Sequence, residues 1–147
     1  MTNLLNDDVR KQVSEAFDQL QEPVQILFFG SKEQCEYCDD TLLLVEEVAG
    51  LSDKLSVQAF DMDADAAVAD NYNVSMVPGL VIAAEGEDGP VDYGVRYAGI
   101  PSGHEFSSLI QDLLLVSGRD SGLNEQTREF LAGLKEPVHL QVFVTPT

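Results

Sequence analysis

VQILFFGSKEQCEYCDDTLLLVEEVAG, residues 24–50, joins a short apolar run, a pair of cysteines and an amphipathic segment in immediate succession. The apolar run 24–29 is too short for a helix and lies between a proline and a glycine, which predicts a buried strand. The apolar residues of the amphipathic segment favour one helical face and stop at a glycine, which predicts a helix that ends there. Cys35 and Cys38, the only cysteines of the chain, lie where the strand turns into the helix.

The spacing of the two cysteines is compatible with a redox centre, with half of a metal site, or with coincidence. Their position favours a redox centre, because unpaired N–H groups and the helix dipole stabilise a thiolate at the amino end of a helix. Cys35 is therefore predicted to attack a substrate disulfide. Cys38, one helical turn later and more shielded, is predicted to resolve the mixed disulfide.

Carboxylates crowd the cysteine pair, and a reactive thiolate prefers positive surroundings. The acids are Glu33, Glu36, Asp39 and Asp40. Each like charge disfavours the thiolate, although acids are also ordinary in the first turn of a helix. We therefore expect Cys35 to ionise less readily than the first cysteine of a C-x-x-C site flanked by uncharged residues.

The remaining apolar patterns extend this unit to the order α-β-α-β-α-β-β-α. The segment GEDGP predicts a hairpin between the last two strands, and Ser102 with Glu105 predicts a capping box for the closing helix. A β-α-β unit followed by a hairpin and a helix resembles the thioredoxin fold, an α/β fold with a central mixed β-sheet flanked by helices. The predicted helices are 4–20, 35–49, 63–73 and 103–117, and the predicted strands are 24–29, 54–63, 77–85 and 93–99.

Ten residues near the carboxyl end repeat an earlier stretch. LQEPVQILFF (20–29) and LKEPVHLQVF (134–143) share five identities, and a predicted helix precedes each. The repeat predicts a thioredoxin-like module with the C-x-x-C over 1–118, a linker over 119–122, and the first helix and strand of a truncated second module over 123–147. The chain is expected to be a fragment, because it stops close to where the second copy would place its own cysteine pair.

Three segments carry a more specific resemblance: FFGSKEQCEYC, NYNVSMVPG and GVRYAGIPSGHEF. Together with the repeat, they resemble the amino-terminal half of the glutaredoxin-like protein disulfide oxidoreductases, which carry two thioredoxin-fold modules, each with its own C-x-x-C. The resemblance covers essentially the whole chain in order. It implies thiol–disulfide exchange on protein substrates, with Cys35 as nucleophile and Cys38 as resolving thiol.

The proline of SMVPGL lies just before a predicted strand, where proline is tolerated. In thioredoxin-like folds a cis-proline at this junction lies beside the cysteine pair and exposes backbone groups that hold the substrate chain. The resemblance thus predicts a cis Val77–Pro78 bond and a substrate-binding role for both residues.

Composition restricts the partners. Twenty-six acids against eight bases give a net charge of −18, which argues against nucleic acid and against an anionic membrane surface as partners. A lone C-x-x-C and the lack of signal-peptide features at the amino end lead us to expect a cytoplasmic protein. The expected partners are protein thiols and disulfides and a reductase that recycles the pair, and no cofactor is expected besides the Cys35–Cys38 disulfide.

Other interpretations compete with redox catalysis. The chain could be a redox-inert thioredoxin-fold binding or scaffold module. Lys32 matches a lysine that helps glutaredoxins to hold glutathione. Zinc would need both His104 and His139 beside the two cysteines, or thiolates from two chains, because four ligands are required. The acids of DMDADAAVAD lack the glycine of a calcium loop.

The predicted tail elements, helix 123–133 and strand 138–144, have apolar faces that need a partner. We expect them to pack on the first module or to exchange with another copy, which gives a homodimer.

Overall fold

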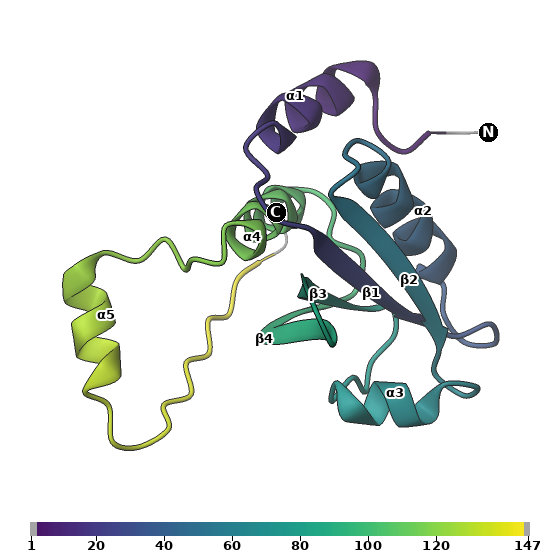
Figure 1. Cartoon of the computed structure of the whole chain (residues 1–147). Coiled ribbons are helices and arrows are strands. Elements are labelled where there is room, and N and C mark those ends of the chain that lie inside the picture. The colour runs from purple at the N-terminus through teal and green to yellow at the C-terminus, as the bar shows by residue number, and fades with distance from the viewer. Residues whose placement is uncertain (1–2, 146–147) are drawn as a thin grey trace.

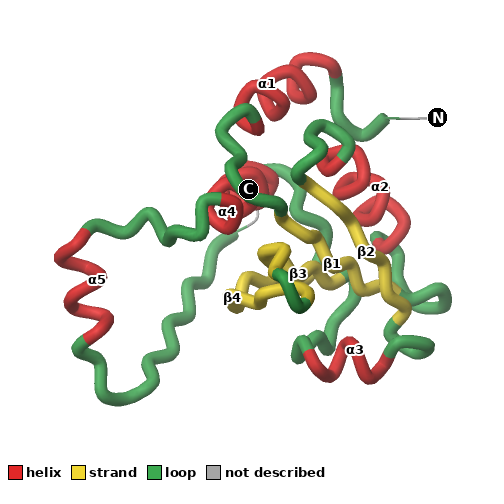
Figure 2. Tube along the Cα trace, in the orientation of Figure 1, coloured by secondary structure: helices red, strands yellow, loops and turns green. Residues whose placement is uncertain are grey.

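A central mixed sheet of four strands, in the order β2-β1-β3-β4, carries helices on both faces (Figures 1 and 2). The structure is a computed structural model that describes residues 3–145. The predicted α/β class and the mixed sheet flanked by helices are confirmed. The elements are α1 (Asp7–Phe17), β1 (Val24–Gly30), α2 (Cys38–Ala49), β2 (Leu55–Asp61), α3 (Ala66–Asn71), β3 (Gly79–Gly86), β4 (Gly89–Ala98), α4 (His104–Ser117) and α5 (Glu125–Ala132).

The strand directions bring three chain segments to one edge of the sheet. β1 pairs in parallel with β2 and antiparallel with β3, and the β3–β4 hairpin completes the sheet. The register pairs Phe29, near the end of β1, with Gly79, the first residue of β3. Because parallel strands end at the same edge, β1 and β2 both end where β3 begins.

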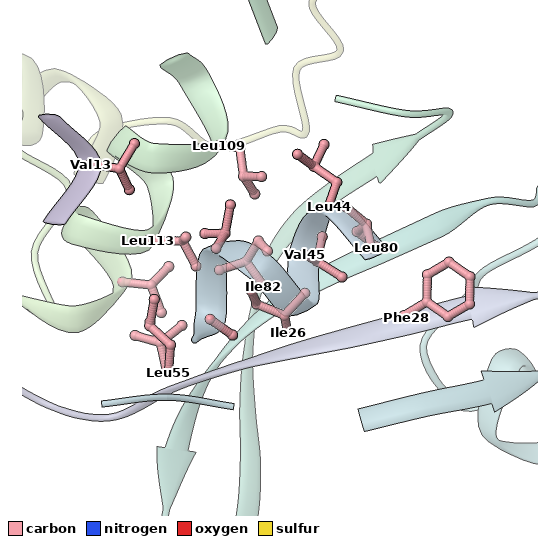
Figure 3. Packing of buried hydrophobic residues seen from close by; sticks show 14 of the residues in the cluster. Val13, Ile26, Phe28, Leu44, Val45, Leu55, Leu80, Ile82, Leu109 and Leu113 are labelled. Atoms are coloured by element: carbon pink, nitrogen blue, oxygen red, sulfur yellow. The ribbon is translucent and has the colours of Figure 1, made fainter. Parts of the chain in front are cut away.

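The apolar run of β1 serves two buried layers. Ile26 and Phe28 pack in the larger core, which β3, α1, α2 and α4 also line (Figure 3). Leu27 and Phe29 point to the other face of the sheet and pack near α3 in a smaller cluster. A strand covered on both faces needs apolar residues at successive positions rather than at alternate ones, which explains why the four residues 26–29 are all apolar.

Ser117, the last residue of α4, ties that helix to the segment that enters β1. Its side chain is fully buried. The hydroxyl accepts hydrogen bonds from the N–H groups of Gln21 (2.8 Å) and Glu22 (3.1 Å) and donates one to the Glu22 carbonyl (2.7 Å). One small polar residue therefore satisfies several buried backbone groups at once.

Replacing Ser117 by alanine is expected to lower the free energy of unfolding by about 2–3 kcal/mol, because buried backbone groups of the β1 entry lose their partner. Urea denaturation followed by circular dichroism measures this loss. Ser108→Ala is the matched control: Ser108 is exposed on the same helix, and its replacement should change stability by less than about 0.5 kcal/mol. Equal losses for the two variants would show that the buried hydrogen bonds contribute nothing beyond helix propensity.

The predicted capping box is wrong. α4 begins one residue later than the motif requires, with Gly103 at the N-cap position and no side-chain cap among the described residues. Gly103 has a φ of 61°, a left-handed conformation that glycine adopts without strain. The turn after Pro101 thus brings the chain into the helix through backbone geometry rather than through a serine hydroxyl.

The predicted tail helix is present as α5, but the predicted strand 138–144 does not form. Over 137–145 the chain is irregular and exposed, and side chains such as Leu140 (86% exposed) and Phe143 (90%) face solvent. In the first module the repeated residues of β1 pair with strands on both sides. Within residues 3–145, the tail segment has no such partners, and a strand without a ladder is not stable. The tail also does not pack on the first module, which was one of the two arrangements expected from the sequence.

The predicted boundary of the first module lies next to a helix end. α4 ends at Ser117, and residues 119–122 contain no helix or strand. The assignment of the remaining residues to a second module stays a prediction, and positions 1–2 and 146–147 of the predicted ranges lie outside the described residues.

Candidate redox site

The cysteine pair lies at the sheet edge where β1 and β2 end. After Gly30 the chain makes a turn and enters α2 at Cys38. Cys35 and Cys38 form a disulfide with their Cα atoms 5.4 Å apart. The strand, the turn and the helix that the sequence predicted around the pair are therefore all present.

The two sulfurs differ in burial, as the sequence predicted. Cys38 is 5% exposed and belongs to the larger core, whereas Cys35 is half-buried at its margin. The helix begins later than predicted, because the residues before Tyr37 form a turn. Cys35 therefore lies just ahead of the first helical turn rather than inside it, and Cys38 is the first helical residue.

Gly30 allows the end of β1 to approach the disulfide. A Cβ atom at this position would lie 2.7 Å from the ring of Phe28 and 3.4 Å from the Sγ atom of Cys38. The first distance is shorter than any ordinary carbon contact. A side chain at this position would therefore displace the Phe28 ring, so glycine serves close packing beneath the pair rather than an unusual backbone angle.

The Val77–Pro78 peptide bond is cis, as predicted. The pairing of Phe29 with Gly79 places Pro78 opposite Gly30, at the same sheet edge as the cysteines. The Pro78 carbonyl accepts a hydrogen bond from the N–H of Gly99 (2.8 Å). Val77 and Cys35 both pack against the larger core, so the sequence-predicted site residues are brought to one edge of the molecule.

Two exposed apolar side chains flank this edge and were not singled out from the sequence. Tyr37 lies between the cysteines and is 50% exposed, and Met76 precedes Val77 and is 63% exposed. The signal that could have found them is their position in the sequence, because Tyr37 lies within the C-x-x-C and Met76 lies two residues before Pro78. They offer apolar contacts to a partner that approaches the disulfide.

A cleft of about 500 Å³ opens beside the disulfide, and we refer to it as the disulfide cleft. β1, the cysteine turn, α2, β2 and the β2–α3 turn contribute its walls. It is lined by Phe28, Gly30, Ser31, Lys32, Cys35, Cys38, Asp39, Leu42, Ala59, Phe60, Asp61 and Asp65. Of these, Asp61 and Asp65 belong to the acidic segment that was weighed as a calcium site and interpreted as the solvated start of a helix, and the sequence did not place them beside the cysteines. The signal that could have found them is the parallel order of β1 and β2, whose carboxyl ends meet at one edge.

The described residues contain no group of three or more histidine, cysteine or acidic side chains placed to hold a metal ion. His104 is exposed in the first turn of α4, and His139 is exposed in the tail. None of the described helices has the length and apolar character to cross a membrane.

A charged side chain of β4 anchors the segment that leads to Pro78. Arg96 on β4 donates hydrogen bonds to the Tyr72 carbonyl (2.9 and 3.2 Å) and forms an ion pair with Asp92 (2.6 Å). The hydrogen bond from Arg96 lowers the pKa of Asp92, so the carboxylate stays charged. The guanidinium fork thus fixes the start of the loop that carries Met76, Val77 and Pro78.

No protein-family model matches the chain. Among solved structures, it is similar to a protein disulfide oxidoreductase from Aeropyrum pernix, with a TM-score of 0.77 and 28% identity, covering 88% of this chain and 55% of that one. It is equally similar in fold to the alkylhydroperoxide reductase component AhpF of Enterococcus faecalis, with a TM-score of 0.77 and 25% identity over 88% of this chain and 61% of that one. These two likenesses confirm the thioredoxin-like fold and the resemblance to the disulfide oxidoreductases.

Curated relatives align along nearly the whole chain. An NADH dehydrogenase of Bacillus subtilis is 25% identical over 144 residues, 98% of this chain and 25% of the relative. The corresponding alkyl hydroperoxide reductase component of Pseudomonas aeruginosa is 26% identical over 140 residues, 95% of this chain and 24% of the relative. The chain thus spans about a quarter of the length of the curated relatives it matches.

Proposed function

We propose that the chain is a thiol–disulfide oxidoreductase that exchanges disulfides with protein substrates through Cys35 and Cys38. The observation that carries this proposal is the disulfide itself, which joins a half-buried and a buried cysteine at a sheet edge beside an open cleft. A purely structural disulfide gains nothing from a cleft that reaches it, whereas thiol exchange requires access to one sulfur.

The two sulfurs take different roles in the proposed exchange. In the reduced protein the Cys35 thiolate attacks a substrate disulfide, the substrate S–S bond breaks, and one substrate sulfur leaves as a thiolate that takes up a proton. Cys38 then loses its proton and attacks the Cys35 sulfur, which releases the second substrate thiol and forms the Cys35–Cys38 disulfide. Two electrons pass from the protein to the substrate in one cycle.

Val77 and Pro78 are proposed to hold the backbone of the substrate chain. Pro78 lies at the edge of the sheet opposite Gly30, and Val77 packs against the same core as Cys35. A substrate segment laid along this edge would bring its cysteine close to Cys35, and its apolar side chains would contact Met76 and Tyr37.

The proposal is tested by insulin reduction with dithiothreitol as the electron source. The protein should make insulin turbidity appear well before it does with dithiothreitol alone. The reason is that the cysteine pair of a protein that binds insulin attacks the insulin disulfide faster than free dithiothreitol does. A rate equal to that of dithiothreitol alone would instead favour the redox-inert binding or scaffold module.

A reductase is proposed to return the oxidised pair to the dithiol, since the cycle consumes two electrons per turnover. Similarity to components of alkyl hydroperoxide reductases, which are named as reductases, supports such an electron-transfer partner. A cytoplasmic location is also proposed, because a lone C-x-x-C fits a reducing compartment.

We further propose a homodimer that covers the tail. α5 has no buried residue, and apolar side chains of 138–144 are exposed, so the tail carries apolar surface that a second copy can bury. Light scattering after size-exclusion chromatography should give the mass of a dimer. The variant Leu140→Ser/Phe143→Ser should give a monomer, and a monomeric unmodified chain would contradict the proposal.

A further inference from the structure

Acidic side chains surround the disulfide cleft. They are Asp39, Asp61 and Asp65 in the lining, with Glu33 and Glu36 exposed on the adjoining turn. Lys32 is the only cation among the described residues that line the cleft. Acids outnumber bases three to one in the lining, so a substrate that reaches Cys35 meets a negative potential.

Backbone hydrogen bonds hold two of these carboxylates in place. Asp61 accepts from the N–H groups of Asp63 (3.0 Å) and Ala64 (3.1 Å), and Asp65 accepts from the N–H of Asp61 (2.9 Å). The hydrogen bonds from Ala64 and Asp63, together with the charge of Lys32, lower the pKa of Asp61. The carboxylate of Asp61 therefore stays charged at neutral pH, and backbone hydrogen bonds hold both carboxylates in position.

The other walls of the cleft are apolar. Phe28 is buried, Phe60 and Leu42 are half-buried, and Ala59 is exposed at the rim. Lysine and arginine side chains combine an aliphatic stem with a charged head, and they bury the stem on apolar surface while the head stays polar. A cleft with apolar walls and a carboxylate rim matches both parts of such a side chain.

We infer that the disulfide cleft selects basic polypeptide segments, with a lysine or arginine of the substrate next to its target cysteine. This inference rests on the proposed function and names its substrate class. Charge complementarity at the cleft should act on the rate of encounter, and salt should weaken it because the acids of the turn are exposed. The substrate disulfide is reduced by the Cys35 and Cys38 thiols, as in the exchange described above.

General acidity of the surface is the competing explanation, because the whole chain carries a charge of −18. Three exposed acids near the β3–β4 turn provide a matched control: Glu85, at the end of β3, and Glu87 and Asp88, in the turn itself. β3 runs antiparallel to β1, so this turn lies at the end of the sheet opposite to the cysteines. Removing charges there changes the net charge by the same amount but leaves the cleft unchanged.

The test uses reduced protein and three peptide disulfides that differ only in the residues flanking cysteine, which are lysine, serine or glutamate. Rates are measured at low and high ionic strength by acid quench, alkylation and mass spectrometry. The quantity compared is the ratio of the lysine-peptide rate to the serine-peptide rate. The reactivity of the Cys35 thiol cancels within each ratio. The leaving ability of each peptide thiol cancels when the ratio is compared between variants or between salt concentrations.

The ratio should exceed the corresponding glutamate-to-serine ratio and should fall about three- to tenfold in Glu33→Gln/Glu36→Gln/Asp39→Asn at low ionic strength. Asp61→Asn/Asp65→Asn is a second variant, whose amide oxygens can still accept the turn hydrogen bonds, and it should lower the ratio in the same direction. The control Glu85→Gln/Glu87→Gln/Asp88→Asn should leave the ratio within about 1.5-fold of the unmodified protein, because its charges lie beyond the screening length.

Each alternative outcome has a definite meaning. Equal falls in the cleft variants and the control would overturn the inference in favour of general surface charge. Faster reduction of the glutamate peptide, or of oxidised glutathione, would overturn it in favour of anion binding by Lys32. Failure to reduce the serine peptide at all would overturn the proposed function itself, whereas reduction of all three peptides at one rate would overturn the inference alone.

Discussion

Insulin reduction is expected to fall to the rate of dithiothreitol alone when Cys35 is replaced by serine. Cys35 is the sulfur at the margin of the core, in reach of the disulfide cleft, and Cys38 is 5% exposed. A serine hydroxyl is not ionised at neutral pH and does not displace a thiolate from a disulfide, because exchange depends on the thiolate. Cys38 is only 5% exposed, so it should not take over the first attack at a comparable rate.

The Cys38→Ser variant should fail at the second step instead. Cys35 still attacks, but the mixed disulfide has no neighbouring thiol to resolve it, so protein–insulin adducts should accumulate when the reduced variant is mixed with insulin after dithiothreitol has been removed. Non-reducing electrophoresis after quenching with an alkylating agent detects these adducts, which should be absent from Cys35→Ser. Measuring both activity and adducts in the two variants distinguishes the nucleophile from the resolving thiol. Loss of activity alone does not distinguish them.

Gln34→Ser provides the matched control for both cysteine variants. Gln34 is exposed and directly precedes Cys35, so it places serine in the same turn without removing a sulfur. It should retain insulin reduction close to that of the unmodified protein. Adducts formed by Cys35→Ser rather than by Cys38→Ser would reverse the assigned roles, and full activity in both cysteine variants would show that the disulfide is not a redox centre.

Local sequence patterns were sufficient to predict the architecture around the cysteines. The run of β1 is apolar at nearly every position because both faces of the strand are covered, and such a run between proline and glycine has few alternatives. Pro78 could be placed because a fold-level resemblance supplied its context. Its distance from the cysteines in the sequence carries no such information, and only the register of β1 with β3 brings them together.

The features that sequence reasoning missed depend on contacts between distant segments. Ser117 looks like an ordinary helix end, yet it binds backbone groups 95 and 96 residues away. Asp61 and Asp65 become part of the cleft only through the parallel pairing of β2 with β1. The capping box failed for a different reason: the glycine after Ser102 allows a backbone turn that replaces the side-chain cap.

The tail shows the limit of a repeat as a predictor. Residues 134–143 carry the pattern of β1, but a strand is defined by its ladder, and among residues 3–145 the tail has none. α5 forms because a helix satisfies its own backbone groups, and the Asn124 side chain caps it by accepting from the N–H of Thr127. The same local signal therefore predicted a correct helix and an incorrect strand.

Phe29→Ala is expected to cause the largest loss of stability, about 3–5 kcal/mol, because it opens a cavity in the smaller of the two cores. Phe29 is fully buried, and its ring stacks on Phe60 with centroids 5.2 Å apart and lies 6.2 Å from the ring of Tyr72. The loss is a large fraction of the stability of an ordinary domain. The smaller core also packs α3 and Val74 against the sheet, so the segment leading to Pro78 should loosen together with it.

Urea denaturation of the oxidised protein measures this effect, since the disulfide then contributes equally to every variant. The midpoint should fall, and the apparent dependence on urea should fall with it, because the smaller core is expected to unfold ahead of the larger one. Phe29→Leu is the control, because a leucine fills most of the ring volume, and it should cost less than about 1.5 kcal/mol.

Insulin reduction adds a second readout. Phe29→Ala should lose activity at urea concentrations where its disulfide and α2 are still intact. The reason is that the Pro78 segment packs on the smaller core, whereas the cysteines pack on the larger one. Unfolding of both regions at one midpoint, with activity lost in parallel, would show instead that the sheet couples the two cores into a single cooperative unit.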